Sequence, residues 1–262
     1  MIKKTIAVIT GASGGLGKEF VRILSDKREL DEIWAIARNE SKLNELKTLY
    51  GNKVIVFSHD LSDKNFVCEF ESKIKDANAE IKYLINNAGF AKFCSYNDIS
   101  VAESLNMIDL NVSAAVAMGL ICIPYIKRGG HIINIASQAA FQPLPYLNIY
   151  SATKAFLRNY TRALNVELKD RGITATAVCP GWMNTGLLDR GAIGARHTVN
   201  NFAGMASTAA VAQKAIKDAD KGKDMSVYGA YTKFCHLVAK LLPQKIMIKL
   251  WMHQQHFYNS LS

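Results

Sequence analysis

The sequence lacks the cysteine pattern of a disulfide-stapled or zinc-binding protein. Its cysteines are odd in number, and no two of them have the C-x-x-C spacing. They are Cys68, Cys94, Cys122, Cys179 and Cys235. Because disulfide frameworks and zinc sites need paired or clustered cysteines, we expect free thiols, no metal site and a reducing, cytoplasmic environment.

It also lacks an uninterrupted apolar run of the roughly 18 residues that a membrane-spanning helix needs. The longest run, 114–126, contains Pro124. Near the N-terminus, Lys3 and Lys4 precede an apolar stretch that stops at Thr10, too early for the core of a signal peptide. We therefore expect a first strand there, and neither a signal peptide nor a membrane span.

Charge excludes a further class of protein. The formal net charge is +10, yet no run of lysine and arginine is interleaved with aromatic residues. A nucleic-acid partner is therefore not expected, and we interpret the charge as solvated surface. With 262 residues, 49% of them hydrophobic, the chain can bury one large core, so we expect a single domain over 1–262.

What the chain does contain begins with a strand, a glycine-rich turn and a helix. A β-branched apolar run at 5–10 enters the turn, and apolar residues recur at helical spacing in 18–25. Glycines let a ligand approach the backbone, and the N–H groups that open a helix attract a pyrophosphate. The pattern therefore favours nucleotide binding over a plain glycine-rich turn. The turn consists of Gly11, Ala12, Ser13, Gly14, Gly15, Leu16 and Gly17.

The strand predicted at 32–37 ends in Arg38. An arginine at this strand end accommodates the 2′-phosphate of NADP, whereas an acidic residue would bind the ribose hydroxyl of NAD. A surface arginine beginning a loop is the alternative. After the strand predicted at 53–58, Asp60 is either a helix cap or a ligand contact, and its position alone favours neither.

The strand predicted at 83–86 runs into Asn87, Ala88 and Gly89, whose small side chains leave room for a flat ring or a ribose. A long helix is predicted at 101–126, and its second half is apolar on all sides, which indicates the core or a subunit contact. Asn111 in its middle is either solvent-facing or bonded for a purpose.

Tyr150 and Lys154 lie four residues apart in a helix predicted at 149–169, so both project from one face about 6 Å apart along the axis. A nearby ammonium favours the phenolate and lowers the pKa of a tyrosine, which suits Tyr150 to general acid or base work. Ser137 follows an apolar run and offers a hydroxyl for a substrate oxygen. Alone, the pair is a weak signal, because many surface helices carry one.

In their order and spacing, these motifs resemble those of the short-chain dehydrogenase/reductase family. The matching residues are 10–17, 86–89, Asn111, Ser137, 150–154 and Pro180-Gly181 with Thr185. The resemblance implies an α/β, doubly wound (Rossmann) fold whose seven-stranded parallel sheet is flanked by helices. Its strands would start near Thr5, Glu32, Lys53, Tyr83, His131, Thr174 and Ser226.

The resemblance also implies the roles of residues. Asn111, Ser137, Tyr150 and Lys154 would form the catalytic tetrad of an oxidoreductase that acts on CH–OH or C=O groups. Ser137 would hold the substrate oxygen and Tyr150 would pass its proton. Lys154 would bind the nicotinamide ribose, and Asn111 would hold a water that relays the proton.

The same resemblance assigns the cofactor contacts. They are Gly11, Ser13, Gly14, Gly15, Leu16, Gly17, Arg38, Asp60, Leu61, Asn87, Ala88, Gly89, Tyr150, Lys154, Pro180, Gly181 and Thr185. The expected cofactor is NADP rather than NAD. One departure bears on this choice, because relatives that prefer NADP often carry a basic residue where this chain has Gly14, so Arg38 alone supports it.

Aromatic and aliphatic residues around these motifs predict a pocket for a bulky, apolar ketone or secondary alcohol. Plain core packing explains each of them equally well. Residues 186–207 are predicted to form a mobile lid, in which Arg190, Arg196 and His197 would meet an anionic tail or only water. The expected wall residues are Phe90, Phe93, Phe141, Leu144, Tyr146, Trp182, Met183, Leu187 and Leu188.

A C-terminal helical extension at 230–262 has helices predicted at 232–242 and 244–256, split by Pro243. Its basic, amphipathic pattern suits a pocket lid or subunit contact, which we favour, or a membrane surface. A homo-oligomer, a dimer or tetramer, is expected from the apolar helix at 112–126. Alternative functions are a catalytically idle nucleotide sensor and a membrane-surface binding protein on the same fold.

Overall fold

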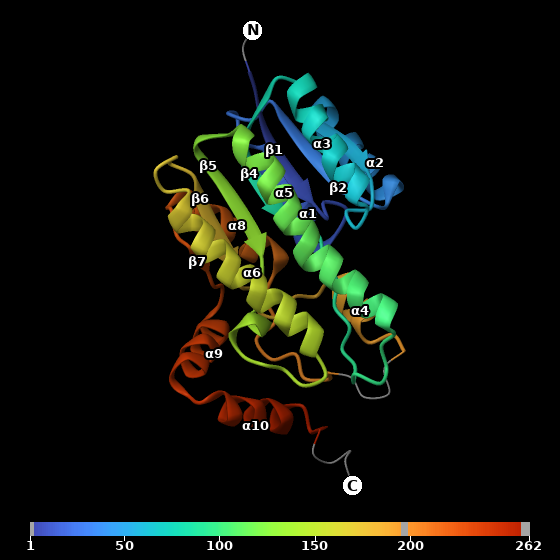
Figure 1. Ribbon diagram of the computed structural model, residues 1–262, viewed down its shortest axis with the longest axis vertical. Helices are drawn as coiled ribbons and strands as arrows, with labels where there is room; N and C mark the ends of the chain where they lie inside the picture. Colours follow the sequence, from blue (N-terminus) through green and yellow to red (C-terminus); the bar gives the residue numbers. More distant parts are fainter. Residues whose placement is uncertain (1–2, 195–198, 258–262) are drawn as a thin grey trace.

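The computed structural model describes residues 3–194 and 199–257, and over this part the chain forms one sheet between two layers of helices (Figure 1). The sheet has seven strands in the order β3-β2-β1-β4-β5-β6-β7, and every pairing is parallel. The predicted doubly wound fold is therefore confirmed. The strands are β1 (Lys4–Thr10), β2 (Glu32–Ala37), β3 (Val54–Ser58), β4 (Ala79–Asn86), β5 (Ile126–Ile135), β6 (Thr174–Val178) and β7 (Met225–Ser226).

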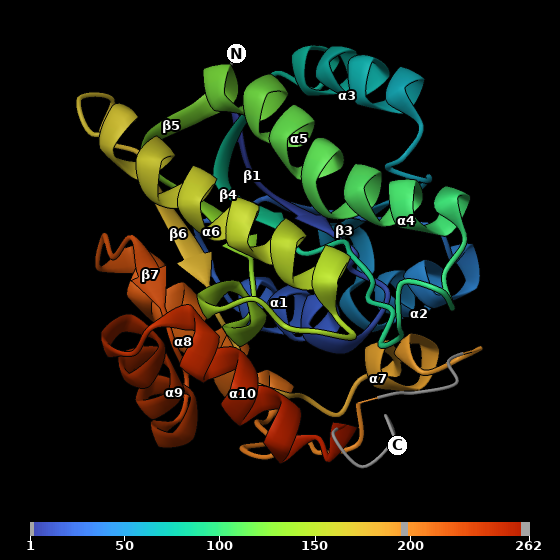
Figure 2. The same cartoon turned by 60° about the horizontal axis from the view of Figure 1, so that its bottom comes forward.

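Helices cover both faces of the sheet, as Figure 2 shows. One layer holds α1 (Gly15–Ser25), α2 (Glu40–Tyr50) and α8 (Thr208–Asp220). The other holds α3 (Lys64–Asp76), α4 (Val101–Ile108), α5 (Ala114–Cys122) and α6 (Asn148–Glu167). Beyond the carboxyl ends of the strands lie α7 (Gly186–Gly191), α9 (Ala230–Leu241) and α10 (Gln244–Gln254). Single 3-10 turns occur at Gly51–Lys53, Ile123–Tyr125 and Gln138–Phe141.

Burial from both sides explains why the central strands are continuous apolar runs rather than alternating ones. In β1, each residue from Thr5 to Thr10 is buried. Burying one large aliphatic side chain contributes about 1.5–3 kcal/mol, so these runs fix the sheet in the middle of the molecule. In α6, the buried residues recur at helical spacing, which turns Tyr150, Lys154 and Leu157 inward together.

Two strands begin earlier than predicted. β4 starts at Ala79 rather than Tyr83, because Ala79 and Ile81 are buried while the intervening polar residues are partly exposed. β5 starts at Ile126 rather than His131. Between these two residues the register with β4 shifts, and Gly129 adopts a φ of 76°. This irregular, charged segment gave no strand pattern in the sequence.

The helix predicted at 101–126 is interrupted. A π-helical turn, Asp109–Ser113, separates α4 from α5, and the helical stretch ends at Tyr125. By length and composition alone, Val101–Tyr125 is apolar enough to span a membrane, which differs from the sequence prediction, but 44% of its most apolar window is buried. Its second half packs against α3 and the sheet. Of the two predicted explanations for its apolar residues, the core and a subunit contact, this packing agrees with the core.

We predict that Gly17→Ala destabilises the fold, although alanine normally favours a helix. A Cβ atom at residue 17 would lie 2.1 Å from the carbonyl oxygen of Gly11, in the backbone, which cannot move aside cheaply. Urea unfolding should show a loss of about 3 kcal/mol, the upper end of overpacking costs. The matched control is Gly14→Ala, whose Cβ would meet nothing within 4 Å. Equal stability of the two variants would contradict this packing.

Candidate functional site

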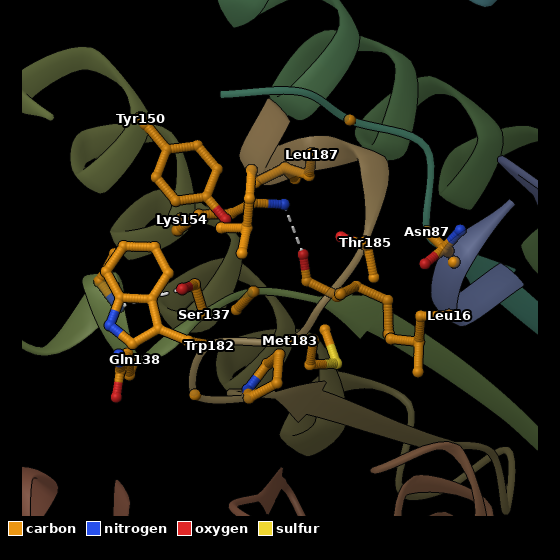
Figure 3. Close-up of a pocket in the computed structure, with 18 of the residues that line it drawn as sticks. Leu16, Asn87, Ser137, Gln138, Tyr150, Lys154, Trp182, Met183, Thr185 and Leu187 are labelled. Carbon is orange, nitrogen blue, oxygen red and sulfur yellow. Dashed lines mark hydrogen bonds between the residues drawn. The ribbon is translucent and has the colours of Figure 1, made fainter. Parts of the chain in front are cut away.

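A cavity of about 790 Å³ lies at the carboxyl ends of the strands. It spans the point between β1 and β4 where the strand order reverses, the usual place for a ligand in an open parallel sheet. Figure 3 shows Tyr150, Lys154 and Ser137 on one side of this cavity and Leu16 and Asn87 on the other. The predicted catalytic and nucleotide-binding motifs therefore share one cavity.

The glycine turn forms one end of the cavity. Gly11 and Gly15 have positive φ angles of 64° and 49°, which favour glycine. Gly14 precedes α1 in an extended conformation, and the helix start has no side-chain cap within the described structure. The Gly17 N–H donates to the Gly14 carbonyl at 3.0 Å, so the N–H groups of Gly15 and Leu16 are the ones suited to an anion. Of the predicted turn contacts, Gly17 does not line the cavity; it packs against the Gly11 backbone instead.

Thr10 and Asn87 join the ends of β1 and β4. The Thr10 hydroxyl accepts hydrogen bonds of 3.0 Å from the backbone N–H groups of Asn87 and Ala88. The Asn87 side chain donates to the carbonyl oxygens of Thr10 and Gly11, each at 3.1 Å. Asn87, Ala88 and Gly89 line the cavity as predicted, but the Asn87 amide group also holds two strand ends together.

Arg38 and Asp60 form an ion pair at the outer end of the cavity, with Arg38 Nη1 3.4 Å from Asp60 Oδ2. The other Asp60 oxygen accepts from the backbone N–H and the hydroxyl of Ser62, at 3.0 and 2.8 Å. Burial alone would raise the Asp60 pKa, but these hydrogen bonds and the Arg38 charge lower it below its usual value. Asp60 thus caps a turn and lines the cavity with Leu61, while Asp63 caps α3.

Lys42 and His59 also line this end of the cavity, and the sequence prediction missed both. Lys42 lies in the first turn of α2, where its backbone N–H is capped by the side chain of Asn39. Its spacing of four residues from Arg38 is a signal that could have found it, because the helix that follows β2 starts beside the strand end.

At the other end, Tyr150, Ser137 and Lys154 are buried. The Ser137 hydroxyl is a hydrogen-bond partner of the Tyr150 phenol and accepts from the Ala139 N–H at 3.1 Å. Lys154 Nζ donates to the carbonyl oxygen of Ile135 at 2.7 Å and lies 5.7 Å from the centre of the Tyr150 ring. One turn of α6 and the end of β5 thus meet as predicted.

The expected effect of Lys154 on the Tyr150 pKa is wrong for the chain alone. Burial raises the Tyr150 pKa to about 12, and the hydrogen bond with Ser137 offsets only part of that rise. Burial also lowers the Lys154 pKa to about 8. Both changes have one physical cause, because a dry environment disfavours the charged form of either group, and the lysine ammonium is directed at Ile135 rather than at the phenol oxygen.

Asn111 lies in the π-helical turn and is fully buried, but it does not line the cavity. Its side-chain oxygen accepts from the Phe90 N–H at 3.0 Å, and its amide group donates to the Phe90 carbonyl at 2.9 Å and to the Thr153 hydroxyl at 3.2 Å. The side chain is therefore occupied in tying the loop after β4 to α6. Its predicted role of holding a water stays a prediction.

The segment after β6 passes along the cavity, which Pro180, Gly181 and Thr185 line as predicted. The predicted lid is partly helical, since α7 occupies Gly186–Gly191, and it is tied back by a bridge between Met183 and Ala206. Arg190 lines the cavity while its Nε donates to the Gly186 carbonyl at 2.9 Å. Arg196 and His197 lie outside the described residues.

Six of the nine predicted wall residues line the cavity; the others, Phe90, Phe93 and Tyr146, pack in a neighbouring apolar cluster. Phe93 is fully buried, with its ring at van der Waals distance from Gly191. The six that line it are Phe141, Leu144, Trp182, Met183, Leu187 and Leu188. The substrate end of the cavity is therefore mostly apolar.

The sequence favoured a pocket lid or subunit contact for the C-terminal helices, but it named none of their residues, nor Gln138, as lining the cavity. Val238, Met247 and Trp251 line it, which fits the pocket-lid interpretation of the C-terminal helices. Gln138 follows Ser137 and also lines it; its side-chain oxygen is buried and has no hydrogen-bond partner in the part of the chain described. Such an unpaired acceptor suits a donor on a bound molecule.

A family model described as short chain dehydrogenase matches residues 5–192. An uncharacterised oxidoreductase of Staphylococcus epidermidis is 31% identical over 186 residues, which cover 70% of this chain and 80% of that protein. A ketoacyl reductase of Nostoc sp. is 30% identical over 246 residues, covering 91% of this chain and 83% of the relative.

Solved structures agree with these relatives. A short-chain dehydrogenase from Streptomyces avermitilis superposes with a TM-score of 0.77 at 21% identity and covers 100% of this chain and 99% of its own, which shows the fold. A short-chain dehydrogenase from Sphingobium yanoikuyae in complex with NADPH has a TM-score of 0.75 at 26% identity and covers 93% and 94%. The glycine turn, the strand order and these matches together show that the chain belongs to the short-chain dehydrogenase/reductase family of oxidoreductases.

Proposed function

We propose that the protein transfers hydride between NADP(H) and a bulky, apolar ketone or secondary alcohol, with Tyr150 as the general acid or base. The observation that carries this proposal is the buried meeting of Ser137, Tyr150 and Lys154 in the same cavity as the glycine turn. A nucleotide held by the turn would share this cavity with the phenol.

The residues present fit a dinucleotide. The uncapped start of α1 suits a pyrophosphate, and nothing stands within 4 Å of where a Cβ at Gly14 would be. Arg38 and Lys42 provide two cations where a 2′-phosphate would lie, which supports NADP over NAD. Two structural relatives support it too, since one was solved with NADPH and a serine dehydrogenase, at 27% identity, with NADP+.

The bound nicotinamide would supply or accept the hydride; the protein manages the proton. Ser137 donates its hydroxyl to the substrate oxygen, while Tyr150 gives that oxygen its proton. With a pKa near 12, Tyr150 is protonated at neutral pH, which suits the reduction of a carbonyl. Lys154, with a pKa near 8, exchanges its own proton readily at neutral pH and would bond a ribose hydroxyl of the cofactor.

Asn111 acts in this proposal as a positioning residue. It holds the Phe90 backbone and Thr153 together and so fixes one wall of the cavity beside α6. The idle-sensor alternative gains no support from the site. A sensor would need the glycine turn alone, whereas the chain also buries a lysine ammonium, which costs stability.

We also propose a homo-oligomer through α4, α5 and α6, which lie side by side in Figures 1 and 2. Leu105, Leu120, Phe156 and Val166 on these helices are 56%, 61%, 46% and 71% exposed. Apolar residues exposed on neighbouring helices are a typical subunit contact.

Tyr150→Phe should lower kcat for ketone reduction by roughly 100- to 10,000-fold, because the substrate oxygen loses its proton donor. NADPH affinity, measured by fluorescence titration, should change by less than about twofold, since the phenol ring and its packing are retained. The control is Tyr96→Phe, at an exposed position outside the cavity. Turnover like that of the wild type would refute the assignment of Tyr150.

Arg38→Gln should weaken NADPH binding by about tenfold or more, the effect of losing one charge-assisted contact to a phosphate. NADH binding should change little, because NADH has no 2′-phosphate. Arg28→Gln, at an exposed site outside the cavity, is the control. An equal effect on both cofactors would contradict NADP preference through Arg38, and isothermal titration calorimetry with each cofactor measures it.

Lys154→Met should abolish turnover and stabilise the cofactor-free protein by about 2 kcal/mol at pH 7, after the lost hydrogen bond to Ile135 is allowed for. The lysine pKa is lowered from 10.5 to about 8. Below pH 8 the folded state therefore bears the full cost of a buried charge. Between pH 8 and 10.5, Lys154 is deprotonated in the folded state but still protonated in the unfolded state, so its destabilising effect on the folded state becomes smaller as the pH rises.

Urea unfolding at pH 7 and pH 10 tests this. The difference between Lys154→Met and the wild type should be larger at pH 7. Lys169→Met, at an exposed position, should show no such dependence on pH. A variant that is less stable than the wild type at pH 7 would contradict the pKa shift.

A further inference from the structure

The C-terminal helices α9 and α10 carry an exposed apolar surface. We define this C-terminal apolar surface by six residues, Phe234, Leu237, Leu241, Leu242, Ile246 and Leu250, which are 37% to 71% exposed. Figure 1 places α9 and α10, the helices that carry it, beyond the carboxyl ends of the strands. Exposed patches of this size on α9, α10 and the turn between them are usually covered by another protein, a ligand or a membrane.

The lysine, arginine, aspartate and glutamate residues of the segment that carries this surface have one sign of charge. From Met225 to Ser262 the chain contains four lysines and neither aspartate nor glutamate. The lysines, Lys233, Lys240, Lys245 and Lys249, are all exposed and lie on the same two helices. Lysine stems can lie along apolar material while their ammonium groups reach phosphate, so the pattern complements an anionic lipid surface.

The surface is continuous with the cavity. Phe234 and Leu250 line the cavity and are also 63% and 48% exposed, so they form its rim on this side. Val238 and Met247 continue the apolar lining inward toward Trp251. An apolar substrate that enters the cavity past Phe234 and Leu250 therefore meets the apolar side chains of Val238, Met247 and Trp251 next.

We propose that the C-terminal apolar surface docks on an anionic lipid bilayer and that the cavity takes its substrate from that bilayer. The second half rests on the proposed reductase function; the docking does not. Apolar helices with flanking lysines bind the interface by burying their apolar side and attracting anionic headgroups. Each lysine near such a surface raises partitioning by about fivefold.

Two other occupants fit less well. A second copy of the chain would bring four more lysines against these four, and like charges oppose such a contact. A pocket lid accounts for the inner face, where Met247 and Trp251 are buried, but it leaves Leu237, Leu241 and Ile246 exposed. The lid and the docking surface are the two sides of the same helices.

The test is co-sedimentation of the full chain with vesicles of phosphatidylcholine, with or without phosphatidylglycerol. The apolar variant combines Leu237→Ser, Leu241→Ser and Ile246→Ser, none of which lines the cavity. Its matched control combines Leu49→Ser, Tyr96→Ser and Val101→Ser, at positions 72%, 74% and 76% exposed on other elements. The charge variant combines Lys240→Gln, Lys245→Gln and Lys249→Gln, with Lys47→Gln, Lys169→Gln and Lys217→Gln as its control.

The wild type should bind the phosphatidylglycerol vesicles, and both C-terminal variants should bind at least about tenfold more weakly, while both controls bind like the wild type. Added salt should weaken binding of the wild type. Docking is overturned if the wild type binds anionic vesicles no better than neutral ones, or if the controls lose as much binding as the variants. A vesicle-free dimer that the apolar variant dissociates would instead assign the surface to a second copy.

NADPH oxidation separates docking from the reductase proposal. A long-chain methyl ketone dissolved in vesicles should be reduced at least about tenfold more slowly by the apolar variant, while water-soluble cyclohexanone is reduced equally by variant and wild type. Equal rates on the vesicle-borne ketone overturn delivery from the bilayer. Normal vesicle binding with neither ketone reduced would uphold docking and count against the reductase function.

Discussion

The hydrogen bonds between Thr10 and Asn87 fix the relative position of two strand ends, and the candidate site depends on that position. They join the carboxyl ends of β1 and β4, where the strand order reverses. From this point the sheet continues through β2 and β3 on one side and through β5, β6 and β7 on the other. Gly17 permits a second close approach here, because a Cβ atom at residue 17 would lie 2.1 Å from the Gly11 carbonyl oxygen. The start of α1 is thereby placed at the cavity, which Gly15 and Leu16 line.

The sequence was informative wherever the chemistry is local. The glycine turn, the Tyr150–Lys154 spacing and the residues that end each strand are short motifs, and the structure brings nearly all of them to one cavity. Periodicity placed α9 and α10 to within about two residues. Short motifs can be recognised in the sequence because residues close together in the chain are also close together in the structure.

Long-range packing accounts for what was missed. A pocket lid or subunit contact was expected of α9 and α10, but which of their residues line the cavity depends on where Pro243 turns the chain, and no local pattern states this. The direction of the Tyr150 pKa shift depends on how dry α6 becomes and on Lys154 finding the Ile135 carbonyl. Asn111 was predicted to be either solvent-facing or bonded for a purpose. Its partner Phe90 lies in the loop after β4, far from it in the sequence, so this contact could not be foreseen.

The π-helical turn at Asp109–Ser113 determines which side chains of α5 meet the sheet. A π turn holds one residue more than an α turn, and each residue of a helix advances by about 100° around its axis. Loss of a single residue at this turn would therefore convert it to a regular α turn and leave α5 in phase with the sheet. Loss of a residue within α5 itself would rotate the residues that follow by about 100° and carry Cys122, fully buried now, out of the core. A deletion is consequently tolerated more readily at the π-helical turn than in α5.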